Sequence, residues 1–146
     1  FSSANFPQLV KSTTANWPKY QLAYDPTTKE TAVWYVNLTT NISAVSSATM
    51  ELFLTATSSG GTSVWAINTR TLTSGGDFSV VGSTTLTSTA TSITSTQVNR
   101  VTAGLAASSW TTPSVLQISI AREVADAGDA STGDQYLYNA ALRITV

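Results

Sequence analysis

The sequence predicts an all-β protein: a single-domain, jelly-roll-like β-sandwich of about 7–9 antiparallel strands. Three observations predict this class. Short apolar segments show a period of two. Turns of Gly, Ser, Asp and Pro separate these segments, and no segment has a convincing helical period. The 146 residues can bury a core without disulfides, and the missing Cys-Trp-Cys signature favours a jelly roll over an immunoglobulin-like sandwich.

Residues 1–18 are expected to form an irregular N-terminal arm, and residues 19–146 the sandwich domain. Pro7 and Pro18 interrupt the arm, and its apolar residues follow no clear period. Exposed apolar side chains on an arm need a docking surface, either on their own domain or on a neighbouring subunit. The side chains concerned are Phe1, Phe6, Leu9, Val10 and Trp17.

The first half of the domain is expected to hold four strands. They cover residues 20–24, 31–38, 49–56 and 63–72. Tyr35 and Phe53 are expected on the outer faces of the second and third, opposite the more apolar side of each strand. In the fourth, Trp65 lies among consecutive apolar residues, so this strand is either buried on both faces or meets a neighbour with its outer face.

The region from Phe78 to Trp110 is rich in Thr and has the weakest pattern. We expect a short strand near Phe78, one or two Thr-rich strands between Ser83 and Ser95, and a strand followed by a loop over residues 99–110. The alternative for the Thr-rich part is a surface ribbon that covers a sheet edge.

The last third of the chain is expected to form a strand, an acidic loop and a strand. Val115–Arg122 and Tyr136–Val146 alternate with a period of two, and the second is apolar enough to be a central strand. Between them, Asp126, Asp129 and Asp134 are weak candidates for oxygen ligands of Ca²⁺.

The spacing of an EF-hand is absent from this acidic loop, and no Glu closes it. Turn-forming Asp residues explain the loop without a metal, and an ion pair from Arg122 to Asp126 or Asp129 would hold it in place.

The composition excludes several kinds of active site. Without His or Cys there is no Ser-His-Asp or Cys-His nucleophile and no zinc site of the usual ligands, and no Gly-rich phosphate loop is present. A carboxylate pair for glycoside hydrolysis stays formally open, but most of the acidic residues fall in predicted turns. We therefore expect neither an enzyme nor a cofactor.

The charge and the hydroxyl content of the chain indicate which kinds of partner its surface can attract. The net charge is −1 with 10% charged residues, which gives little attraction for nucleic acid or anionic membranes, and no apolar run has the length of a membrane helix. Ser and Thr make up about a third of the chain. Such a surface suits a subunit packed among many copies, or equally a monomeric sandwich with a Thr-rich exterior.

Several segments resemble a family of small β-domains in tailed-phage virions. The segment Tyr24–Trp34 resembles the family's opening, an aromatic-Asp pair, a turn and then Glu-x-Ala-x-aromatic. Later family features are a Val-Trp pair, an apolar strand, an Arg-acidic pair, an Asp-rich loop and a last strand. They are matched by Val64–Trp65, Leu116–Ile120, Arg122–Glu123, Asp126–Asp134 and Leu137–Val146. The arm of residues 1–18 has no counterpart in the family, and residues 41–47 replace its usual Pro and Gly-Gly.

The resemblance implies a structural protein of the virion, most simply a capsid decoration protein, otherwise a head- or tail-fibre module. It would form homo-oligomers, with a trimer favoured, and bind a major capsid or other virion protein. The expected contact residues are Phe1, Phe6, Leu9, Val10, Trp17, Tyr35, Phe53 and Trp65.

Two other functions stay open. One is a secreted appendage or surface-layer subunit at the surface of a prokaryotic cell. The other is a carbohydrate-binding or fibre adhesion module, which needs exposed aromatic side chains on one face. The aromatic candidates are Trp34, Tyr35, Trp65 and Trp110.

Overall fold

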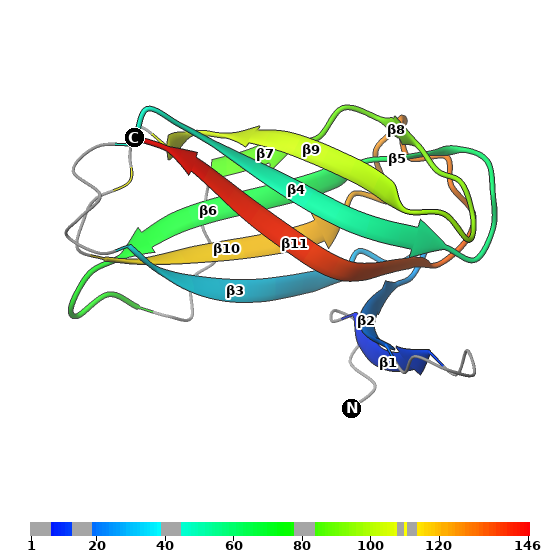
Figure 1. Cartoon of the computed structure of the whole chain (residues 1–146), viewed down its shortest axis with the longest axis horizontal. Helices are drawn as coiled ribbons and strands as arrows, with labels where there is room; N and C mark the ends of the chain where they lie inside the picture. Colours follow the sequence, from blue (N-terminus) through cyan, green and yellow to red (C-terminus); the bar gives the residue numbers. More distant parts are fainter. Residues whose placement is uncertain (1–6, 13–18, 39–44, 78–83, 108–109, 111–113) are drawn as a thin grey trace.

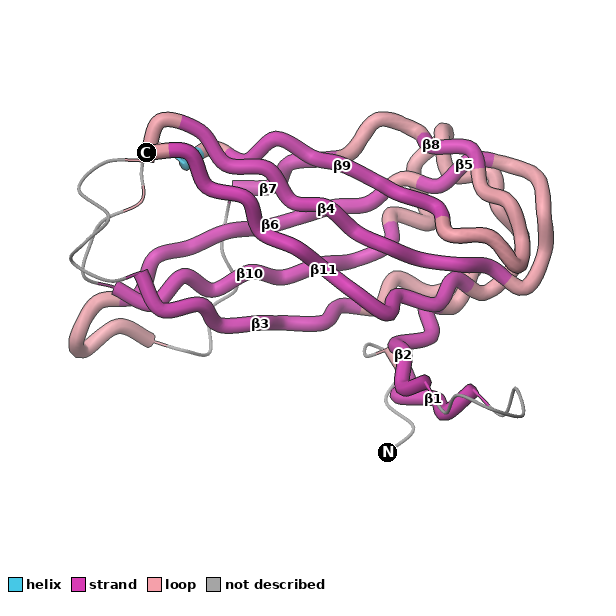
Figure 2. Tube along the Cα trace, in the orientation of Figure 1, coloured by secondary structure: helices cyan, strands magenta, loops and turns pink. Residues whose placement is uncertain are grey.

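The computed structural model describes residues 7–12, 19–38, 45–77, 84–107, 110 and 114–146, and strands dominate these ranges (Figure 2). Two antiparallel sheets pack face to face (Figure 1). One has the order β1 (Gln8–Ser12), β2 (Lys19–Tyr24), β11 (Gln135–Thr145), β4 (Ser47–Ala56) and β9 (Asn99–Leu105). The other has the order β3 (Thr31–Leu38), β10 (Ser114–Arg122), β6 (Trp65–Leu72) and β7 (Thr84–Thr87).

The strand pairings nest inside one another along the chain. β2 pairs with β11, β3 with β10, β4 with β9, and β6 with β7, all antiparallel. A long antiparallel ribbon rolled into two sheets gives this order, which is that of an eight-stranded jelly roll. The predicted fold class is therefore confirmed.

Three further strands bring the number in the described ranges above the predicted one. β5 (Thr62–Ser63) and β8 (Thr91–Ser92) form a two-stranded sheet at one end of the sandwich. The third is β1, inside the arm that we expected to be irregular, where Leu9 pairs in register with Leu22 of β2. Adjacent Leu and Val side chains in β1 hide the period of two, so the sequence gives no sign of this strand. Residues 1–6 and 13–18 of the arm lie outside the described ranges.

The residues with a period of two supply the core. In β10, Leu116, Ile118 and Ile120 face inward and are at most 1% exposed, because β3 and β6 flank this strand on both edges. In β4, the predicted inward residues are all buried: Met50, Leu52, Leu54 and Ala56. Each sheet thus contributes one face to a common core.

The strand with consecutive apolar residues, β6, is buried on both faces at the point where those residues lie. Trp65 and Ile67 point into the core, and Ala66 on the other face is also fully buried. The Trp65 ring packs edge-on against Tyr24, with 4.8 Å between ring centroids. Farther along the strand, Asn68 and Arg70 on the outer face are only partly buried, and the alternative contact of this face with a neighbour stays a prediction.

The described part of the Thr-rich region contains two short strands with irregular segments and a turn after them. β7 and β8 lie between Ser83 and Ser95, and β9 fills the predicted strand after Val98. The strand expected near Phe78 falls outside the described ranges. No helix in the described ranges has the length and apolarity needed to cross a membrane.

Candidate functional site

β2 and β11, the first and last strands of the roll, separate after a short contact. β2 pairs with β11 only from Gln135 to Leu137. The register of β11 on β4 then shifts between Leu137 and Asn139, which marks a β-bulge. Beyond this point β2 turns away with β1, and the β1–β2 hairpin stands off from the sandwich (Figure 1).

The departure of β2 leaves one long edge of β11 without a partner. Asn139–Thr145 pair with β4 on one side and with no described strand on the other. In the facing sheet, β3 is also an edge strand, paired with β10 alone among the described strands. Alternate backbone N–H and C=O groups of an edge strand point outward, where they can pair with an added strand.

An apolar cleft of about 510 Å³ opens between the sheets beside these edges. Trp34 and Val36 of β3 line one wall, and Ala140 and Leu142 of β11 line the opposite wall. Leu9 of β1 lies at the cleft and is 68% exposed. The full lining is Leu9, Gln21, Leu22, Trp34, Val36, Met50, Ile118, Leu137, Tyr138, Asn139, Ala140 and Leu142.

The chemistry of the lining is uniform. No lining residue carries a charge, and Gln21 and Asn139 are the two with amide side chains. The wall residues Trp34, Val36 and Leu142 are only partly buried although they face inward. A surface of this kind gains free energy when it is covered, about 25 cal/mol for each Å² of apolar area removed from water.

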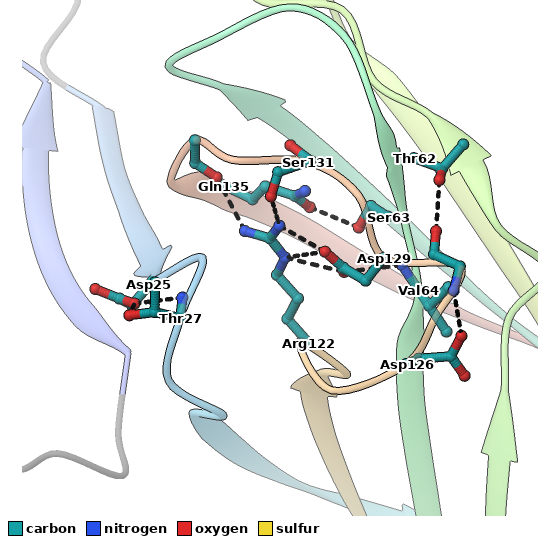
Figure 3. A network of polar contacts seen from close by, with 12 residues as sticks. Asp25, Thr27, Thr62, Ser63, Val64, Arg122, Asp126, Asp129, Ser131 and Gln135 are labelled. Atoms are coloured by element: carbon teal, nitrogen blue, oxygen red, sulfur yellow. Dashed lines mark hydrogen bonds and ion pairs between the residues drawn. The ribbon is translucent and has the colours of Figure 1, made fainter.

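The acidic loop between β10 and β11 is held by one buried guanidinium (Figure 3). Arg122 is fully buried, and its Nε and Nη2 donate to the Asp129 carboxylate at 2.7–3.2 Å. Its Nη1 donates to the Gly133 carbonyl at 2.9 Å, and Nη2 also donates to the Ser131 carbonyl. The predicted ion pair between Arg122 and this loop is therefore confirmed, with Asp129 as the partner.

Neighbouring backbone groups complete this network. The Val64 N–H donates to the second Asp129 oxygen at 3.1 Å, and the Ser63 hydroxyl donates to the Gln135 side chain at 2.8 Å (Figure 3). Below the loop, the N–H groups of Ala130 and Ser131 both donate to one carbonyl of β5 at 2.9 Å. The arrangement is a structural clamp on the loop.

The three candidate calcium ligands have separate roles. Asp129 is committed to Arg122, Asp126 accepts the Gly128 N–H at 2.7 Å, and the Asp134 carbonyl accepts the Thr57 N–H at 3.0 Å. In the described ranges, no three acidic side chains gather into a group that could hold a metal. Asp126 thus acts as the turn chemistry suggests, whereas the Asp129 carboxylate serves the ion pair with Arg122.

A second charged cluster lies on the outer face of the five-stranded sheet. Glu51 of β4 forms ion pairs with Arg100 of β9 and Arg143 of β11, the second at 2.9 Å. Hydrogen bonds from these two guanidinium groups lower the pKa of the Glu51 carboxyl. The cluster ties β9, β4 and β11 together across one face.

The predicted contact residues fall into different environments. Leu9 and Tyr35 are exposed at 68% and 50%, and Phe53 is partly buried on an outer face. Trp65 is fully buried in the core, so the expected subunit contact is wrong for this residue. The side chain of Val10, and the residues Phe1, Phe6 and Trp17, lie outside what the structure describes.

The four aromatic candidates for a glycan platform do not share one exposed face. Trp34 faces the cleft, Tyr35 faces the opposite side of the same strand, Trp65 is in the core, and Trp110 packs partly against it. Trp34 and Trp65 face inward because inward strand positions also favour aromatic residues, and Trp110, outside the described strands, packs against the core as well.

The cleft and its free edge were not predicted. The sequence pattern of β11 predicts one unbroken strand, whereas the bulge places both Leu137 and Ala140 against the interior and leaves Tyr138 exposed. The signal in the sequence is the apolar run Tyr136-Leu137-Tyr138, in which both faces of the strand are apolar.

A comparison of the chain with family models, curated proteins and solved structures finds no match.

Proposed function

We propose that the chain is a structural subunit of a virion, a capsid decoration protein that acts by binding copies of itself and the shell. The observation that supports this proposal is the open edge of the sandwich, which is formed by Asn139–Thr145 of β11 and by β3. An apolar cleft flanked by strand edges that have no partner among the described strands is incomplete in a single copy, and a subunit of an assembly is completed by its neighbours.

The fold class supports the proposal without being specific to it. Eight-stranded jelly rolls serve as capsid domains, but also as lectins and other proteins, so the fold alone carries no function. The resemblance of Tyr24–Trp34 to small virion β-domains narrows the choice to the structural class. Asp25 in this segment forms a tight turn, accepting the Thr27 and Thr28 N–H groups at 2.6 and 3.0 Å.

The surface chemistry also supports assembly. A net charge of −1 gives copies little electrostatic reason to avoid one another. Hydroxyl groups keep such a surface wet without charge, and contacts between hydroxyl-rich faces depend little on salt.

Light scattering of the purified chain over a wide range of concentration tests the proposal. We expect a discrete homo-oligomer whose mass is a small multiple of 15.3 kDa, and co-sedimentation with capsid shells that lack the protein. A chain that stays monomeric at every concentration and binds no shell would contradict the proposal.

A subunit of a cell-surface appendage is the second candidate, favoured by the same free edge of β11. Subunits of such appendages can join by adding a strand from one copy to the sheet of the next. The neighbouring genes separate the two: capsid and portal genes accompany a virion protein, and sortase or usher genes accompany an appendage subunit.

A further inference from the structure

The free edge of β11 defines the kind of partner that fits the cleft. From Asn139 to Thr145 the strand offers backbone groups that pair with no described strand on the side from which β2 has departed. Those groups are satisfied by another extended strand, since a helix or a small molecule cannot repeat the spacing of a β-ladder. A strand added at this edge turns every second side chain toward the cleft.

The cleft is suited to apolar side chains at those alternate positions. Its walls are formed by Trp34 and Val36 of one sheet and Ala140 and Leu142 of the other, without a charged group. A strand that fills it therefore places a Leu, Val or aromatic residue against these walls, since a polar residue there would lose its hydrogen bonds to water without replacement.

The chain itself offers one such residue in Leu9 of β1, whose alternate neighbours on the same face are Pro7 and Lys11. β1 is held in its own copy by β2 alone, on a hairpin that stands off from the sandwich (Figure 1). Its Leu9 is 68% exposed, an unusual position for a leucine on a paired strand. Because Leu9 also lies at the mouth of the cleft, the donor strand and the receiving edge sit next to each other on the same surface.

We infer that β1 of one copy pairs with the free edge of β11 in a second copy, with Leu9 inserted into the second copy's apolar cleft. Each copy both gives and receives a strand, which closes the assembly by symmetry and leaves neither cleft open. The inference rests on the proposed structural role and names the contact through which copies join.

Crosslinking between two variants of the full chain tests this contact, because the chain has no cysteine of its own. Leu9→Cys is placed in one preparation and Asn139→Cys, at the start of the free edge, in a second that carries an isotope label. After mixing and dissociation to allow exchange, a short bismaleimide joins copies whose two cysteines lie close together. A crosslinked species with the mixed mass comes only from two different copies.

The control replaces Asn139→Cys with Val98→Cys, since Val98 is 66% exposed and outside the cleft lining. We expect the mixed crosslink for Leu9 and Asn139 at least about tenfold above that for Leu9 and Val98, corresponding to about 1.4 kcal/mol of preference. Equal yields from a chain that does form oligomers would overturn the strand exchange and leave the structural role standing.

Two other outcomes also decide the question. If the wild-type chain never forms an oligomer, the strand exchange fails, and the proposed function fails with it if the chain also binds no shell. If native mass spectrometry shows a monomer with one apolar molecule bound in the cleft, and no mixed crosslink forms, the cleft is a ligand pocket and the inference is overturned.

Discussion

At the scale of single residues, the buried charge of Arg122 lies where each nitrogen of its guanidinium group has a partner. Arg122 would be costly in the core if its guanidinium were unpaired, but Asp129 and two carbonyls of the same loop surround it. A single side chain thereby fixes the conformation of residues 123–134, which contain no regular element. The sequence predicts this ion pair because Arg122 directly precedes a loop rich in Asp.

Asp129→Asn leaves the guanidinium buried without a counter-charge. The Arg122 and Asp129 side chains are 0% and 2% exposed, so we expect a loss of about 3–5 kcal/mol in the free energy of unfolding, measured by urea titration. The matched control is Asp126→Asn, an exposed residue with one local hydrogen bond, which should cost about 1 kcal/mol or less. Similar losses from both variants would show that the buried pair does not hold the loop.

The Glu51 cluster predicts a dependence of stability on pH. Arg100 and Arg143 lower the pKa of the Glu51 carboxyl below its ordinary 4.5, so the ionised form stabilises the folded state. This contribution is present above pH 4.5 and is lost as pH falls through the lowered pKa. The stability advantage of the wild type over Glu51→Gln should therefore shrink on acidification below pH 4.5, as followed by urea unfolding at a series of pH values.

Glu30 provides a contrast of opposite sign. Burial raises the pKa of its carboxyl above 4.5, so ionisation costs stability as pH rises through the raised pKa. Relative to Glu30→Gln, the wild type should gain stability as pH falls toward 4.5. A stability difference that stays constant with pH for both variants would show that neither carboxyl titrates with folding.

At the scale of elements, the long strands could be predicted and the irregular ones could not. The period of two locates β3, β4, β10 and β11 because each has one face against the core. The bulge in β11 interrupts that period. It results from the pairing of β11 with β4, and no turn residue in the sequence indicates it. β5 and β8, of two residues each, exist only through their contact with each other, so local sequence holds no signal for them.

The turn between β4 and β5 shows how tightly the loops at this end are packed. Gly60 and Gly61 both have positive φ, +100° and +77°. A Cβ on Gly60 meets no atom, whereas one on Gly61 would collide with the carbonyl of Ala130 in the acidic loop. Gly61→Ala must therefore move one loop away from the other.

We expect Gly60→Ala to cost about 1–2 kcal/mol of unfolding free energy through backbone conformation alone. Gly61→Ala should cost a further 1–3 kcal/mol or so, because the packed loops must separate. Thermal unfolding of the two variants side by side measures the difference. Equal losses would contradict the close packing of this turn on residues 123–134.

At the scale of the whole molecule, the jelly roll is open along one edge, because β2, its first strand, pairs with only a short part of β11, its last strand. β2 covers three residues of β11 and then departs, although the roll would accommodate a longer partner. Composition and strand pattern predict the sandwich, since they report which residues avoid water. They cannot predict the opening, because the length of contact between β2 and β11 depends on where the N-terminal hairpin folds.

The open edge and the apolar cleft beside it are the basis of the proposed role as a subunit. One copy alone exposes both an apolar cleft and the strand suited to fill it, and two copies together can bury both. Leu9→Asp should prevent this union at little cost to the fold, because Leu9 is already 68% exposed. Val98→Asp, at 66% exposure away from the cleft, is the matched control.

Hydrogen exchange of the β11 backbone tests the union of copies most directly. In wild type and Val98→Asp, at concentrations where copies associate, we expect the amides of Asn139–Thr145 to exchange at least about tenfold more slowly than in Leu9→Asp. Exchange elsewhere in the sandwich should be unchanged. Equal exchange of Asn139–Thr145 in wild type and Leu9→Asp would show that no strand from another copy covers this edge.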